Sequence, residues 1–209
     1  MGEVVELSTH GSRAVGYLAA AGEGAGLGVV VVGESSGLSP LVRDVCDRFA
    51  DEGFTALAPD LTDDPDTAAS DLSDVVDHLT RHPAVRGSGV GVVGFGRGGG
   101  LALWLATRRP QEVRAVVPFY SVALTDRRPD WSRLEASVEG HYAEGGDAGF
   151  EAARSLEKEL TDLGKDVRMF LYPGAAAGFF DDTRPDVHDA DAARQAWVRT
   201  LEFLRAKLG

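Results

Sequence analysis

Three glycines at alternate positions mark the part of the chain whose chemistry is easiest to interpret. Gly94, Gly96 and Gly98 follow the apolar run 90–93 and lead into an Ala- and Leu-rich segment with helical spacing. This pattern predicts a strand, a very tight turn and a helix. In one large group of enzymes the residue at the tip of such a turn is the nucleophile. Here the tip residue is Gly96, which has no side chain with which to attack.

The same stretch also fits the G-x-G-x-x-G pattern of dinucleotide-binding loops, through Gly94, Gly96 and Gly99. A dinucleotide site needs this motif after the first strand of the fold, and an acidic residue about twenty positions further on. Here the motif follows a late strand, and no strand ends in an acidic residue at that distance. We therefore prefer a turn of the G-x-nucleophile-x-G type and expect no cofactor.

Charge and composition restrict the class of partner. The chain has 209 residues with 21 Lys and Arg against 33 Asp and Glu, a formal net charge of −12. Such a surface repels phosphate backbones and anionic lipid, so we expect neither nucleic acid nor a membrane as partner. The single cysteine, Cys46, excludes an intrachain disulfide, and the first residues lack the regions of a signal peptide. We expect a cytoplasmic protein, either a monomer or a homodimer.

Strands and helices are predicted to alternate along the chain. Residues 3–7 and 14–20 predict a hairpin, and apolar runs predict strands at 27–32, 54–58, 90–95, 113–119, 138–143 and 166–172. Helices are predicted from Pro40 up to Gly53, from Asp66 or Thr67 to about His82, and over 97–108, 148–163 and 189–207. This alternation indicates an α/β fold, one domain over 1–209, with a mostly parallel sheet and helices on both faces.

Ligands in open α/β sheets bind beyond the carboxyl ends of the strands. Four loops are expected to meet there, at 34–36, 94–98, 145–147 and 174–180. We therefore expect any functional site at this edge.

Several stretches along the chain carry further motifs. They are residues 32–38 (VGESSGL), 53–61 (GFTALAPDL), 82–85 (HPAV), 91–100, 117–120 (VPFY), 141–144 (HYAE), 172–175 (YPGA), 178–180 (GFF) and 183–185. Together they resemble the dienelactone hydrolase family of α/β-hydrolase proteins over nearly the whole chain. The resemblance implies the α/β-hydrolase fold. Members of that family hydrolyse strained lactones or esters with a Cys–His–Asp triad.

This chain departs from the family at the triad itself. The resemblance puts the cysteine at Gly96, the histidine at Ala177 and the aspartate at Gly146, or at Asp147 if the register slips by one residue. Nucleophile, base and orienting group would then be lost together. No other residue obviously replaces them, and Cys46 lies mid-helix at a position typical of core packing.

Part of the machinery is expected to remain. In this fold the oxyanion hole consists of backbone N–H groups, which here would be those of Arg97 and Ser35. Glu34 matches a family glutamate that pairs with the resting thiol. Without a thiol, Glu34 would face a cavity and could act as a general acid or base. The alternative is that Glu34 has only a structural role.

The cavity is expected to be wide. Ser35 and Ser36 stand where the family has bulky aromatics, and the segment 61–67 is shorter than usual. Candidate pocket-lining residues, each of which could equally be core, are Ser36, Phe95, Phe119, Tyr120, Trp131, Phe179 and Phe180.

We expect a repurposed enzyme that acts on a carbonyl-containing small molecule by cyclisation, isomerisation, epimerisation or elimination. One alternative is a non-catalytic protein that binds a ligand or partner. A second is a hydrolase that works without the triad. No metal ion is expected.

Overall fold

The Val-rich runs of the chain form the centre of a large sheet. The computed structural model describes residues 1–8, 13–22, 24–62, 64–121, 129–145 and 149–209. Strand β3 (Gly26–Val32) lies beside β4 (Phe54–Pro59) and β5 (Val85–Phe95), and every residue of β3 and β4 is buried. A strand buried on both faces reads as a continuous apolar run, which is the pattern of residues 27–32.

The sheet of the described residues has eight strands in the order β1-β2-β4-β3-β5-β6-β7-β8. The hairpin of β1 (Glu3–Ser8) and β2 (Arg13–Ala19) pairs antiparallel with β4 at one end. The remaining pairs, through β6 (Val113–Phe119), β7 (Ser137–Gly145) and β8 (Val167–Ala176), are parallel. The predicted α/β fold with a mostly parallel sheet is confirmed.

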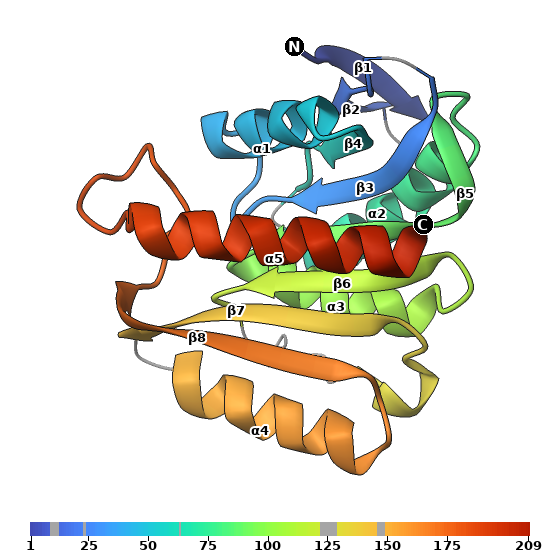
Figure 1. Ribbon diagram of the computed structural model, residues 1–209. Coiled ribbons are helices and arrows are strands. Elements are labelled where there is room, and N and C mark those ends of the chain that lie inside the picture. The colour runs from blue at the N-terminus through green and yellow to red at the C-terminus, as the bar shows by residue number, and fades with distance from the viewer. Residues whose placement is uncertain (9–12, 23, 63, 122–128, 146–148) are drawn as a thin grey trace.

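Helices cover both faces of the sheet (Figure 1). Helices α1 (Pro40–Asp51) and α5 (Ala190–Leu208) contribute to one core cluster. Helices α2 (Pro65–Thr80), α3 (Arg97–Arg108) and α4 (Gly149–Asp162) contribute to the other, together with the short 3-10 helix η1 (Trp131–Arg133). Among the residues that the structure describes, no helix is both long and apolar enough to cross a lipid bilayer.

Three predicted boundaries were wrong. Strand β5 begins at Val85 and not at residue 90. Helix α2 is capped by Asp64, whose carboxylate accepts a hydrogen bond from the Thr67 N–H at 2.9 Å, and not by Asp66 or Thr67. Pro65 takes the first helical position, where its missing N–H costs nothing. Strand β8 continues to Ala176 through the predicted loop, because its pairing with β7 resumes there, opposite Gly145, after a register shift.

Candidate functional site

The turn between β5 and α3 is as tight as its glycines predict. Gly96 has φ 50° and ψ −120°, a backbone conformation that residues with side chains rarely adopt. Two hydrogen bonds fix it: the Gly96 N–H donates to the Phe119 carbonyl at 3.0 Å, and the Gly99 N–H donates to the Gly96 carbonyl at 3.1 Å. The chain therefore makes the strained strand-to-helix turn of a nucleophile elbow without a nucleophile at its tip.

The flanking glycines are required by close backbone contact. A Cβ atom placed on Gly98 would lie 2.8 Å from the carbonyl carbon of Val32, and closer still to the oxygens of Val32 and Gly33. A Cβ atom on Gly94 would lie 2.5 Å from the Gly99 nitrogen. The amino end of α3 thus packs directly against the backbone of β3 and β5, and only glycine leaves room for this.

Glu34 occupies the space above the empty tip. A Cβ atom placed on Gly96 would lie 2.8 Å from Cγ of Glu34 and 2.9 Å from its Cδ and Oε1. Glu34 comes from the loop after β3, and its side chain is exposed to solvent. The side chain of Glu34 therefore lies where a side chain at position 96 would begin.

Tyr120 and Arg184 bring a phenol and a guanidinium to the same edge. Tyr120 follows β6 with φ 39°, and its N–H donates to the His141 carbonyl at 2.7 Å. Burial raises the pKa of the Tyr120 hydroxyl, and the negative charges of Glu34 and Asp181 raise it further, while Arg184 opposes them. The phenol is thus held protonated close to Glu34.

Arg184 and Asp181 were not among the predicted site residues. Arg184 approaches Gly178, since a Cβ atom there would lie 3.4 Å from the Arg184 Nη1. Arg184 belongs to the motif at 183–185, which is visible in the sequence. Its proximity to Tyr120 depends on how the loop after β8 folds back.

The other predicted site residues lie as follows. Ser35 and Ser36 are exposed in the loop after β3, and Arg97 is the first residue of α3. The two candidate oxyanion donors, the N–H groups of Ser35 and Arg97, therefore lie at the carboxyl edge of the sheet. Ala177 is exposed in the turn that follows β8. Gly146 and Asp147 fall outside the described residues. The oxyanion hole itself stays a prediction.

The candidate lining residues divide into two groups. Phe95, Phe119 and Phe179 are buried and stack on one another and on their neighbours, with ring centroids 4.9 Å apart for Phe95 and Phe119. Trp131 is buried in the core cluster of α2, α3 and α4. Tyr120 is half-buried, and its ring lies 5.6 Å from that of Phe179. Tyr120 and Ser36 are thus the lining candidates with solvent access.

Known proteins resemble this chain over its whole length. The model of the dienelactone hydrolase family matches residues 15–65 and 62–208. "Protein usf" of Aquifex pyrophilus is 32% identical over 232 residues, and the "Putative carboxymethylenebutenolidase" of Aquifex aeolicus is 30% identical over 241 residues. Each alignment covers 100% of both chains.

A solved structure gives the same result for the fold. The dienelactone hydrolase-like promiscuous phosphotriesterase from metagenomic libraries superposes with a TM-score of 0.85 at 24% identity, over 100% of this chain and 99% of the other. At this identity the likeness shows the α/β-hydrolase fold. Because the family model spans almost all of the sequence and two full-length relatives are at least 30% identical, the chain belongs to the dienelactone hydrolase family.

Proposed function

We propose that this chain is an enzyme that acts on a small carbonyl compound without a covalent acyl intermediate, with Glu34 as its general acid or base. One observation carries the proposal: the Glu34 carboxylate lies over Gly96, where the family's nucleophile would start. A carboxylate at that point can remove or supply a proton on a bound molecule, but Gly96 offers no atom that could be acylated.

The proposed reaction begins with proton removal next to the carbonyl. The substrate oxygen would accept hydrogen bonds from the backbone N–H groups of Ser35 and Arg97, which stabilise the enolate that forms. Glu34 would take the proton from the adjacent carbon. Return of that proton to another carbon gives an isomer or epimer. Loss of a leaving group gives elimination, and attack on a second electrophile gives cyclisation.

Tyr120 and Arg184 support this chemistry by their charge states. A phenol whose pKa is raised by burial remains a hydrogen-bond donor across the physiological range. The Arg184 cation can neutralise an anionic substituent on the substrate. Both groups would favour a small molecule with several oxygen atoms.

The name of the Aquifex aeolicus relative favours a second candidate, the hydrolysis of a lactone. In that case Glu34 would activate a water molecule for attack on the carbonyl. The same residues would be used, but the ring would open. This reaction again requires no nucleophile at Gly96.

Two lactone probes separate these reactions by proton NMR in D2O. α-Angelica lactone carries an acidic proton next to its carbonyl, and proton transfer converts it into the conjugated β-isomer with deuterium at the γ-carbon. Carboxymethylenebutenolide reports ring opening. We expect the wild-type protein to accelerate isomerisation and to leave both rings closed.

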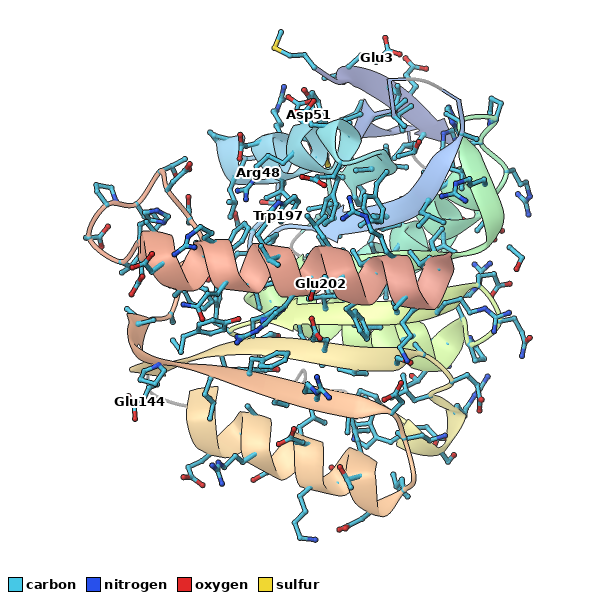
Figure 2. All side chains as sticks on the ribbon, viewed as in Figure 1. Glu3, Arg48, Asp51, Glu144, Trp197 and Glu202 are labelled. Carbon is cyan, nitrogen blue, oxygen red and sulfur yellow. The ribbon has the colours of Figure 1, made fainter. Side chains whose placement is uncertain are left out.

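Glu34→Gln is the decisive variant because it keeps the size of the side chain and removes its basicity. We expect it to lose a factor of about 100 or more in rate. Glu3→Gln on β1, at the far end of the sheet (Figure 2), is the matched control and should keep full activity. Full activity of Glu34→Gln would overturn both candidates. Ring opening that depends on Glu34 would support hydrolysis, and binding without turnover would leave a ligand-binding protein.

A further inference from the structure

A cavity lies away from the elbow, between α5 and the outer strands β7 and β8. It has a volume of about 460 Å³ and is lined by Glu139, Arg168, Phe170, Arg199, Glu202 and Phe203. Glu139 and Arg168 are paired near the amino ends of β7 and β8, whereas the elbow lies at the carboxyl ends of the strands. Figure 2 shows Glu202 on α5, the helix that crosses this face. The cavity is therefore separate from the candidate active site.

The two arginines of the cavity are held by aromatic rings. The guanidinium carbon of Arg199 lies 4.1 Å from the centroid of the Phe170 ring, and that of Arg168 lies 5.7 Å from it. Arg199 also donates a hydrogen bond to the Tyr172 hydroxyl at 3.0 Å. Neither arginine forms an ion pair with a carboxylate of the described residues. Stacking orders both cations and leaves N–H groups available for an anion.

One oxygen of the Glu139 carboxylate is buried without a hydrogen-bond donor among the described residues. Its side chain is only 9% exposed, and its buried Oε1 has no hydrogen-bond partner within the part of the chain that the structure describes. The nearest candidate donor, Nε2 of His141, is 3.6 Å away, which is too far for a hydrogen bond. An oxygen buried in this way costs free energy until a donor reaches it.

The hydrogen bonds around His141 explain why it cannot satisfy Glu139. Nδ1 of His141 lies 3.0 Å from the Tyr172 hydroxyl, which also accepts a hydrogen bond from Arg199. Nε2 lies 3.1 Å from the Thr200 hydroxyl. Both ring nitrogens therefore have a hydrogen-bond partner other than Glu139.

We propose that this cavity binds a small zwitterion, an α-amino acid with an apolar side chain. The ammonium group would donate to Glu139 and face Glu202, the carboxylate would bind the guanidiniums of Arg168 and Arg199, and the side chain would pack on Phe170 and Phe203. The inference does not depend on the function proposed for the elbow.

Ligands with one charge fit the cavity less well. A simple carboxylate would bind the arginines but leave Glu139 without a donor and place a second anion near Glu202. A simple amine would pair with the carboxylates but leave the two guanidiniums without an anionic ligand. Only a molecule with both charges satisfies both sides of the cavity.

Binding should depend on pH through Glu139. Burial raises the pKa of Glu139 to about 7, opposed by Arg168 and Arg199 and assisted by Glu202. His141, which also faces this carboxyl, stays neutral because burial lowers its pKa to about 3. An ammonium group needs the ionised carboxylate. The affinity for an amino acid should therefore rise as the pH increases through about 7.

Calorimetric titration of the full chain with three related probes tests the proposal. L-Phenylalanine carries both charges, phenylacetate lacks the ammonium group and phenethylamine lacks the carboxylate. We expect L-phenylalanine to bind about tenfold or more tightly than either analogue, since each lost charged hydrogen bond weakens binding by at least that factor. If the three probes bind with equal affinity, or if none of them binds, the proposed amino-acid site is wrong.

Variants identify the residues and separate this site from the elbow. Glu139→Gln and Arg168→Gln should each weaken L-phenylalanine binding about tenfold. Arg168 is exposed, so its variant should fold even if the buried Glu139→Gln does not. The exposed Arg133→Gln and the elbow variant Glu34→Gln should bind like the wild type. Unchanged affinity in Arg168→Gln, or loss of binding in Glu34→Gln, would contradict the assignment.

Discussion

Replacing elbow glycines by alanine should give a graded loss of stability, because the added methyl group meets different obstacles at each position. At Gly98 the new Cβ atom meets the backbone of Val32 and Gly33, which belongs to the central strand and the loop that follows it. At Gly96 its three nearest neighbours are all atoms of Glu34, a solvent-exposed side chain that can turn away. Gly164, with φ 70° and nothing within 4 Å, isolates the cost of the backbone conformation alone.

The contacts give the size of each effect. For Gly98→Ala, the carbonyl carbon of Val32 would have to move from 2.8 Å to at least the 3.4 Å of ordinary contact, which forces α3 away from β3. Overpacking of this kind costs about 3 kcal/mol or more. For Gly96→Ala the main cost is the strained backbone, about 1–3 kcal/mol. For Gly164→Ala we expect about 1 kcal/mol.

Urea unfolding followed by circular dichroism measures these free energies for the wild type and the three variants. The expected order of destabilisation is Gly98→Ala, then Gly96→Ala, then Gly164→Ala. Thermal midpoints should follow the same order, at about 2–4 °C for each kcal/mol. If Gly98→Ala is as stable as Gly164→Ala, α3 does not pack against β3 as described, and the account of the elbow fails.

Three further predictions concern titratable groups. The Arg109 guanidinium lowers the pKa of Asp77 from 3.8, so their pairing stabilises the fold above that value and is lost as the pH falls through the lower folded pKa. Asp77→Asn should therefore lower the urea midpoint at pH 7, and the difference from the wild type should vanish in acid. The pKa of Glu139 is instead raised from 4.5 to about 7, so the free energy of unfolding of the wild type should fall as the pH rises across that range. Glu139→Gln should flatten this fall. If the variant shows the same pH profile as the wild type, the pKa assigned to Glu139 is wrong. Burial raises the pKa of the Cys46 thiol, so Cys46 should not react with DTNB until the protein unfolds. Rapid labelling of the native protein would contradict the burial of Cys46.

The central elements could be predicted because their signals are local. The end of β5, the turn at Gly96 and α3 follow from an apolar run, glycine spacing and helical periodicity, and all three lie where the sequence indicates. The start of α2 was misplaced although Asp64 and Pro65 together form a strong start signal. The end of β8 was misplaced because Pro173 and Gly174 favour a turn, and Gly174 does take φ 78°. Pairing with β7 resumes beyond them at Ala176, which no local pattern indicates.

The sites depend on contacts that no local pattern contains. Glu34 was predicted to face a cavity, but the sequence does not say how far its carboxylate extends over Gly96. The approach of Arg184 to Tyr120 requires the loop after β8 to fold back. The cavity beside α5 depends on the register that pairs Glu139 with Arg168, and on the turn of α5 that brings Arg199 to the same place.

The way the elbow is held has a consequence for the history of such proteins. The backbone of Gly96 is fixed by its hydrogen bond to Phe119 and by the close packing around Gly94 and Gly98, and no side chain at the tip takes part. A glycine codon that ends in a pyrimidine differs from a cysteine or serine codon by a single base. A lineage with this elbow can therefore lose or regain a nucleophile in one mutational step without first rebuilding the turn, once the Glu34 side chain turns away from the tip.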